Sequence, residues 1–305
     1  MTHREHSALT FVNSFYELRL YVELMNSALT LSPQIRRQYV DGPYGQVHIH
    51  VATPKTATSH LPLICLHQSP KSSREFVSFM RLMGDRIVIA IDSPGHGESD
   101  TPAQESDATI ENYARSAWTA VTALGYDNVD ILGHHTGAKV ACEMAYQHPE
   151  KVGGIVMISA LVLTPKEREA FKFDFEPIPL DEDGTRFKHM WAQSIKYRGP
   201  GVTLENLAYS MAENLRAGEA YEWGHGAAFN YTDDFAERIK TLPHRVTVLN
   251  PNDMLFEYTR RVGPLLQNGD IIDHPEWGFG FLEADTKGAV AAVKLALNGK
   301  SDKTI

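Results

Sequence analysis

The stretch Gly133-His134-His135-Thr136-Gly137 (GHHTG) decides the fold class. A strand-like apolar run, residues 128–132, precedes it, and a helix-like stretch begins at Ala138. The five residues are therefore expected to form a tight turn from a buried strand into a helix, with glycine at both shoulders. Such a turn lifts its middle residue, here His135, to the top of a sheet, where the side chain is available for chemistry.

Strand-like and helix-like segments alternate on both sides of this turn, which is typical of a parallel sheet with crossover helices. A hairpin is expected first, on both sides of the Gly-Pro-Tyr-Gly turn within residues 37–54. The predicted buried strands cover residues 61–66, 86–91, 129–132, 152–158, 246–249 and 270–272. The predicted helices cover residues 110–124, 138–148, 254–266 and 285–297.

The pattern changes between residues 163 and 240, where short helices broken by proline and glycine replace the strands. We interpret residues 163–240 as a helical cap inserted into a core made of residues 37–162 and 241–305. Residues 1–36 are expected to form an N-terminal helical arm, because apolar side chains recur there at helical spacing. Such an arm would pack on the body or on a second subunit, which leaves a homodimer open.

The composition restricts the partners of the chain. The formal net charge is -9 and no basic run occurs, which argues against nucleic-acid and anionic membrane surfaces. The longest apolar stretch, residues 153–163, is too short to span a bilayer. The polar start shows no secretory signal, and the spacing of Cys65 and Cys142 indicates neither a disulfide framework nor a metal site. We expect a cytoplasmic protein that binds a small-molecule substrate.

Three motifs resemble those of the alpha/beta-hydrolase superfamily. Residues 92–100 (DSPGHGESD) resemble its DxPGxGxSD run, residues 67–70 (HQSP) match its HGxP oxyanion loop, and GHHTG takes the place of its GxSxG nucleophile elbow. The resemblance covers nearly all of residues 37–298. It implies a mostly parallel eight-stranded sheet flanked by helices, with a substrate pocket between the carboxyl edge of the sheet and the helical cap.

The resemblance also assigns roles to individual residues. It implies that His135 occupies the nucleophile position and Asp253 the acid position after the seventh strand. The backbone N–H groups of Thr136 and Ser69 correspond to the two oxyanion donors. Phe279 stands where the superfamily has its catalytic histidine. Two of the three triad positions are therefore replaced, and serine-esterase chemistry is not expected.

Further residues are candidates for the surroundings of the pocket. The pocket candidates are His67, Gln68, His134, Trp191, Trp223 and Phe279. In the superfamily, the histidine at the His67 position braces the oxyanion loop and the residue at the His134 position packs beneath the apex. His274 lies five residues before Phe279 and could replace the missing histidine only if its loop were rearranged.

No metal or cofactor is expected. Adjacent histidines on a sharp turn diverge, so His67, His134 and His135 are a poor ligand set without a carboxylate at ligand spacing. His48 and His50 would share one face of a strand, where we expect them to be surface residues.

Three roles remain open for His135. It could act as a general base or acid, since an imidazole with a pKa near ~6.5 moves protons readily at neutral pH. It could be the nucleophile of ester or thioester hydrolysis. The motifs could also serve folding alone. The favoured reading is an enzyme that cleaves a small carbonyl-containing or aromatic substrate without a cofactor, by hydrolytic or lyase-type chemistry. The alternative is a catalytically inactive small-molecule-binding protein.

Overall fold

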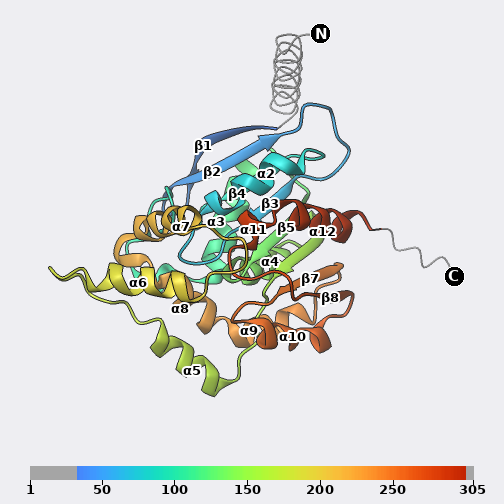
Figure 1. The fold of residues 1–305 in the computed structure, drawn as a ribbon. Coiled ribbons are helices and arrows are strands. Elements are labelled where there is room, and N and C mark those ends of the chain that lie inside the picture. Colours follow the sequence, from blue (N-terminus) through green and yellow to red (C-terminus); the bar gives the residue numbers. More distant parts are fainter. Residues whose placement is uncertain (1–32, 300–305) are drawn as a thin grey trace, which may run out of the picture.

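A computed structural model describes residues 33–299 of the 305-residue chain. Eight strands form one sheet in the order β1-β2-β4-β3-β5-β6-β7-β8 (Figure 1). β2 pairs antiparallel with β1 and β4, whereas every pair from β4 to β8 is parallel. The mostly parallel eight-stranded sheet with flanking helices that the sequence predicts is therefore confirmed.

The elements follow one another in regular alternation on either side of a long helical stretch. The strands are β1 (Gln34–Gly42), β2 (Gly45–Thr53), β3 (Leu63–Leu66), β4 (Val88–Ile91), β5 (Val129–His134), β6 (Val152–Ile158), β7 (Val246–Pro251) and β8 (Gly269–His274). The helices that flank the sheet are α2 (Val77–Met83), α3 (Ile110–Ala123), α4 (Thr136–Gln147), α10 (Phe256–Arg260), α11 (Phe281–Ala284) and α12 (Thr286–Asn298). Within residues 33–299, no helix combines the length and the apolar composition that crossing a bilayer requires.

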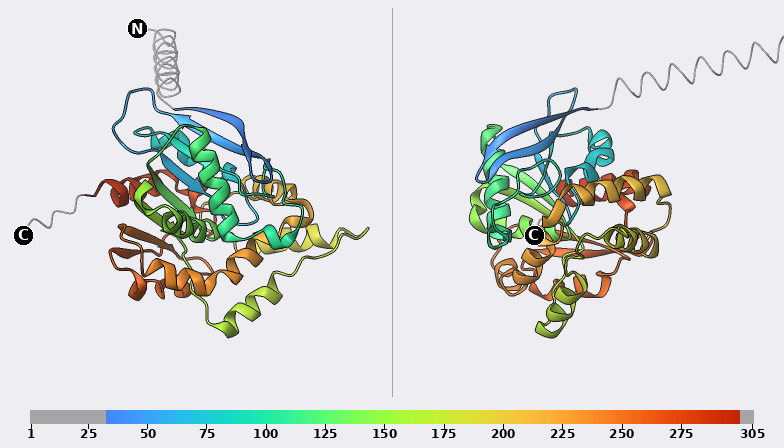
Figure 2. Two further views of the ribbon diagram at one scale, coloured as in Figure 1. Left: turned by 180° about the vertical axis from the view of Figure 1, so that it is seen from behind. Right: turned by 90° about the vertical axis from the view of Figure 1, so that its left-hand side faces the viewer.

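The central strands are apolar throughout because both faces of the sheet are covered. In β3, Ile64 and Leu66 belong to the core under α3 and α4, whereas Leu63 and Cys65 belong to the core under α2 and α12. The helices α2 and α12 lie on the near face in Figure 1, and α3 and α4 on the face seen from behind in Figure 2. Alternation of side chains along each strand thus supplies two cores at once.

The structure differs from the sequence prediction at several boundaries. β1 begins at Gln34, inside the range predicted for the N-terminal arm, and the rest of that range up to residue 32 lies outside the described residues. The helix predicted over residues 254–266 was wrong in its length. It ends as α10 at Arg260, and a separate 3₁₀ turn, Gly263–Leu265, follows. Pro264 accounts for this break, because its ring removes a backbone donor and it tolerates only the start of a new turn.

The stretch between β6 and β7 consists of helices. These are α5 (Pro165–Asp174), α6 (Thr185–Lys196), α7 (Leu204–Arg216), α8 (Trp223–Asn230) and α9 (Thr232–Ile239). We call α5 to α9 the helical segment; Figure 1 shows α6, α7 and α8 together at one end of the sheet. Ser72 donates a 2.5 Å hydrogen bond to Glu213 of α7, and Arg216 of α7 forms an ion pair with Glu98. The helical segment therefore contacts the loops that follow β3 and β4.

Candidate active site

The GHHTG turn has a strained backbone. β5 ends at His134 and α4 begins at Thr136, and His135 between them has φ 49° and ψ -109°. A positive φ is uncommon for any residue other than glycine and marks sites where surrounding structure holds the backbone in place. The His135 N–H donates a 2.9 Å hydrogen bond to the carbonyl oxygen of Ile158. His135 is thereby held at the apex, at the carboxyl end of β5.

Close backbone packing explains the two glycines of the motif. A Cβ on Gly133 would lie 2.1 Å from the carbonyl oxygen of Gly137. A Cβ on Gly137 would lie 2.0 Å from the carbonyl oxygen of Leu66 and 2.9 Å from that of His67. Only glycine permits these approaches. The turn therefore packs directly on the end of β3 and on the loop that follows it.

His135 and Asp253 form a hydrogen-bonded dyad. The Nε2 atom of His135 lies 2.9 Å from Oδ2 of Asp253. The Ser159 hydroxyl donates to the same oxygen over 2.7 Å, and the Leu255 N–H donates to Oδ1 over 2.7 Å. The side chain of Asp253 is 2% exposed and that of His135 is 14% exposed. Both oxygens of the carboxylate thus accept hydrogen bonds, while part of the imidazole is exposed to solvent.

Electrostatics assign the proton in this dyad. Burial raises the pKa of Asp253, but the hydrogen bond and charge of His135 and the Ser159 donor outweigh it, so the pKa lies below its ordinary value. An ionised aspartate only accepts hydrogen bonds, which assigns the proton to Nε2 of His135. A neutral imidazole then has its lone pair on Nδ1. No residue in the described part of the chain forms a hydrogen bond with Nδ1.

Ser159 is a site residue that the sequence analysis missed. It follows β6 directly, is fully buried and has φ 54°. Its N–H donates to the carbonyl oxygen of Leu249 over 3.2 Å, which fixes the hydroxyl beside Asp253. A serine after a buried strand is common, and nothing in the sequence marks this one.

The backbone N–H groups of Thr136 and Ser69 lack partners. Neither donates a hydrogen bond to another group within residues 33–299. Thr136 is the first residue of α4, where N–H groups are unsatisfied by the helix and the helix dipole favours negative charge. The contact of Gly137 with Leu66 and His67 brings this helix start onto the loop that carries Ser69.

His67 and Gln68 brace that loop. Nε2 of His67 accepts from the Ser93 N–H over 2.9 Å, and Nδ1 donates to the carbonyl oxygen of Gln68 over 2.8 Å. The N–H and the side-chain amide of Gln68 donate to the two carboxylate oxygens of Glu75, each over 3.0 Å. Both side chains are buried and hold the loop in place. Their part in lining a substrate pocket stays a prediction.

Glu75 is a second residue that the sequence did not reveal. It lies in the 3₁₀ turn Ser73–Phe76 and its carboxylate is 3.4 Å from Nδ1 of His134. Burial raises the pKa of Glu75, but His134, Lys71 and Gln68 outweigh it, so the pKa is lowered. Burial lowers the pKa of His134 although Glu75 opposes this shift. His134 thus packs beneath the apex, in contact with a buried carboxylate.

Substitution of Glu75 by glutamine is expected to destabilise the protein by about 3 kcal/mol, because a buried charged acceptor of two hydrogen bonds is lost. The new amide would also direct a donor at the Gln68 amide. Urea unfolding measures the loss. Glu98→Gln is the control, since Glu98 and its partner Arg216 are each 42% exposed and such pairs contribute little. Equal effects of both substitutions would contradict this role of Glu75.

Phe279 lies beside the dyad and His274 does not. The ring centroids of Phe279 and His135 are 6.5 Å apart, with the rings inclined at 70°. Nδ1 of His274 instead lies 2.8 Å from Glu276, and its ring stacks on Trp277 at 3.7 Å. His274 therefore makes no hydrogen bond with His135 or Asp253, and the imidazole of His135 reaches the acid directly.

The two tryptophan candidates lie farther out. Trp223, at the start of α8, packs against the core that contains α3 and α4, and Trp191 is half-buried on α6. Neither makes an aromatic contact with His135. Their part in substrate binding remains a prediction.

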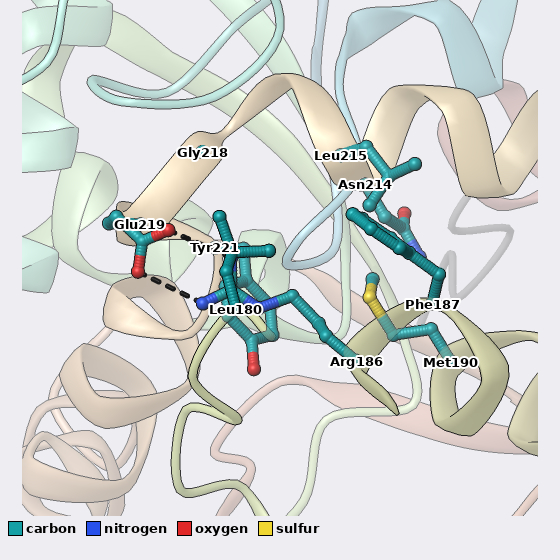
Figure 3. Close-up of a pocket in the computed structure, with 9 residues that line it drawn as sticks. All are labelled: Leu180, Arg186, Phe187, Met190, Asn214, Leu215, Gly218, Glu219 and Tyr221. Atoms are coloured by element: carbon teal, nitrogen blue, oxygen red, sulfur yellow. Dashed lines mark hydrogen bonds and ion pairs between the residues drawn. The ribbon is translucent and has the colours of Figure 1, made fainter. Parts of the chain in front are cut away.

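Of two cavities in the described part of the chain, the larger adjoins the site. One, of about 350 Å³, lies within the helical segment (Figure 3), where Arg186 and Glu219 form a hydrogen-bonded ion pair with N–O distances of 2.9 Å. None of its lining residues belongs to the predicted site. The other, of about 460 Å³, is lined by Asp253 together with Glu167 and Tyr258. It approaches the dyad from the side of α5 and α10.

Buried histidines surround the loops near the site. The prediction that His48 and His50 are surface residues was wrong: they are 2% and 9% exposed. Asp92 accepts from Nδ1 of His48 over 2.8 Å, and Ser73 pairs with Nδ1 of His50 over 2.8 Å. The strand pattern indicates their shared face, whereas the loops that cover that face come from distant sequence. No group of three or more metal-ligating side chains suited to an ion occurs in residues 33–299.

This burial predicts acid lability. Burial lowers the pKa of His50 to about 4 and that of His96 to about 3. Both are neutral in the folded state, whereas the unfolded chain takes up protons below about pH 6.5. The free energy of unfolding should therefore have its highest value above that pH and decrease as the pH drops toward 4. In urea unfolding at pH 7.5, 6 and 5, His96→Gln should reduce this loss. His148→Gln, at a side chain that is 44% exposed, should leave it unchanged; a wild-type protein with pH-independent stability would contradict the prediction.

Comparison with known proteins supports the fold. Residues 62–194 match the family model described as alpha/beta hydrolase fold. A proline iminopeptidase from Heyndrickxia coagulans is 28% identical over 148 residues, which are 45% of this chain and 51% of that protein. A soluble epoxide hydrolase from Corynebacterium sp. (strain C12) is 31% identical over 126 residues, 41% of this chain and 42% of that protein. The chain thus spans about half or less of the length of these relatives.

A solved structure extends the likeness to most of the chain. Epoxide hydrolase A from Mycobacterium thermoresistibile superposes with a TM-score of 0.72 at 14% identity, covering 87% of this chain and 99% of that one. At this identity the likeness concerns the fold alone. The sequence match over residues 62–194 and the order of the eight strands together show that this chain has an alpha/beta-hydrolase fold.

Proposed function

We propose that this protein is a cofactor-independent enzyme that cleaves a small carbonyl-containing or aromatic substrate, with His135 as general base and acid. The 2.9 Å hydrogen bond between Nε2 of His135 and Asp253 carries the proposal. A buried carboxylate that accepts from one ring nitrogen orients the imidazole and stabilises its protonated form. The other nitrogen, Nδ1, is left to take a proton. This arrangement needs no second histidine and is compatible with Phe279 at the usual histidine position.

In a hydrolytic reaction, Nδ1 removes a proton from water while the water oxygen attacks the carbonyl carbon. The carbonyl oxygen becomes an oxyanion that accepts hydrogen bonds from the N–H groups of Thr136 and Ser69. Collapse of this intermediate breaks the bond to the leaving group, which receives the proton from the imidazolium. In a lyase-type reaction, Nδ1 instead removes a proton alpha to the carbonyl, and the same donors hold the enolate.

We further propose that the helical segment acts as a cap over the site. Its contacts with the loop after β3 support this role: α7 accepts from Ser72, and Gly224 of α8 packs so closely that a Cβ there would lie 2.0 Å from the Ser69 hydroxyl oxygen. The two relatives, an iminopeptidase and an epoxide hydrolase, are named for different reactions. The substrate is therefore argued from the residues of this chain.

The proposal is tested with wild-type protein and His135→Gln. p-Nitrophenyl esters report hydrolysis, and deuterium exchange of ketones in D₂O, followed by NMR, reports proton abstraction. We expect one of these reactions in the wild type and neither in the variant. Turnover that His135→Gln leaves unchanged would refute the proposal. An acyl group on His135 in acid-quenched mass spectra would reassign His135 from base to nucleophile.

A small-molecule-binding protein without catalysis is the second candidate. The cavity in Figure 3 favours it, because this cavity is lined by Leu180, Phe187 and Met190 beside an ion pair and His135 is not among its lining residues. A mainly apolar wall with a few polar groups is typical of ligand sites. Thermal stabilisation by a ligand, without product after long incubation, would support this candidate, and turnover of the ligand would exclude it.

A further inference from the structure

Lys71 is a buried cation at the end of the oxyanion loop. It follows Pro70 directly and is 9% exposed. Its ammonium group donates a hydrogen bond to the hydroxyl of Ser210 on α7. No carboxylate in the described part of the chain lies within the 4.0 Å of an ion pair with it. Since an ammonium group has three donors, two remain without a protein acceptor.

The ammonium group faces the same aromatic ring as the dyad. Nζ of Lys71 lies 5.3 Å from the centroid of the Phe279 ring, and that centroid lies 6.5 Å from the centroid of the His135 ring. The separation between Nζ and the His135 ring therefore cannot exceed the sum of these two distances. Lys71 and His135 are thus neighbours of the same ring, that of Phe279.

The charges of Glu75 and Glu283 act on Lys71, but neither carboxylate forms an ion pair with it. Glu75 is already engaged by Gln68 and His134. Glu283 of α11 is influenced by the charge of Lys71, but burial raises its pKa and it forms no ion pair. A buried ammonium group without an ionic partner is unfavourable, and buried charges in proteins are normally paired. Lys71 is therefore a candidate for pairing with an anion from outside the chain.

We propose that Lys71 binds a carboxylate of the substrate, so that the enzyme acts on small carbonyl compounds that also carry an anionic group. This inference rests on the proposed function and specifies its substrate class. The carbonyl group would lie at His135, and the carboxylate between Lys71 and Ser210. Because the ammonium group is shielded from water, its attraction for a carboxylate is stronger than at an exposed lysine.

Selectivity between two matched esters tests the proposal. p-Nitrophenyl hydrogen glutarate and p-nitrophenyl valerate have acyl chains of equal length that differ in a terminal carboxylate. We expect wild-type kcat/KM to favour the glutarate at least tenfold. Lys71→Met should lower this ratio to about one, and Lys71→Arg should retain part of it because the charge is kept. Lys196→Met, at an exposed lysine on α6, should keep the wild-type ratio. A ratio near one in the wild type, or unchanged in Lys71→Met, would overturn the anion site.

Binding without turnover separates this inference from the proposed reaction. Calorimetric titration of His135→Gln protein uses monomethyl glutarate, which carries one carboxylate, and dimethyl glutarate, which carries none. Adding Lys71→Met should raise the Kd of monomethyl glutarate at least tenfold and leave the two compounds equal. If monomethyl glutarate binds more tightly only when Lys71 is present, while the wild type cleaves no ester, the proposed reaction is refuted and the anion site is supported. Equal binding of both compounds to His135→Gln, or binding of neither, overturns the anion site.

Discussion

Replacement of His135 by glutamine is expected to lower kcat/KM by about a thousandfold, because general acid–base catalysis typically contributes 10²–10⁴-fold. Glutamine fills a similar volume but cannot take up a proton at neutral pH. Asp253→Asn should produce a loss of the same order. Its amide would donate to the ring nitrogen that now carries the proton, which shifts the proton to Nδ1 and removes the base. Initial rates on the ester that wild-type protein cleaves fastest measure both effects.

Ser159→Ala is the matched control for this dyad. It removes one of the donors to Asp253 but leaves the 2.9 Å contact with His135 and the Leu255 donor in place. We expect a loss of about tenfold, since one hydrogen bond to a charged group contributes roughly 1.5 kcal/mol or more. Thermal unfolding checks that all three variants fold. If Asp253→Asn lowers kcat/KM no more than Ser159→Ala does, the carboxylate has a structural role and takes no part in the chemistry.

Gly137→Ala is expected to have the largest effect on stability. The new Cβ would lie 2.0 Å from the carbonyl oxygen of Leu66, and neither that backbone nor the start of α4 can move without separating β3 from the turn. Overpacking of this kind costs about 3 kcal/mol or more where backbone must shift. We expect a protein that fails to fold or that unfolds at much lower urea concentration than the wild type.

Gly226→Ala is the control for replacing a glycine by alanine where the new Cβ meets no other atom. Gly226 lies in α8 and a Cβ there would meet nothing within 4 Å. Alanine is favoured over glycine in helices by about 1 kcal/mol, so this variant should equal or slightly exceed the wild type in stability. Urea unfolding compares the two variants directly. Wild-type stability of Gly137→Ala would show that the turn does not depend on contact with β3.

The sequence by itself determines the sheet and the turn at its centre. Continuous apolar runs at residues 63–66 and 88–91, and the mainly apolar run at residues 129–132, specify strands covered on both faces. They become β3, β4 and most of β5. Gly133 and Gly137 specify a tight turn, because its backbone approaches other backbone too closely for any Cβ. Both are local properties of the chain, since side-chain period and backbone sterics act over a few residues. These local patterns predict the class of fold. They did not predict every boundary: α10 ends before Pro264, inside the range predicted as one helix.

Only the tertiary structure decides what His135 contacts. The resemblance implies Asp253 as the partner of His135, whereas the sequence left His274 as an alternative. In the structure, the ring of His274 contacts Trp277 and Glu276 instead. His135, Ser159 and Asp253 meet because β5, β6 and β7 are neighbours in the sheet and end at the same edge. Residues 118 positions apart in the chain are brought to 2.9 Å by strand order, which no local pattern records. The burial of His50, the carboxylate of Glu75 and the unpaired ammonium group of Lys71 follow from the same cause. Each is defined by the segments that pack over it, and these come from distant parts of the sequence.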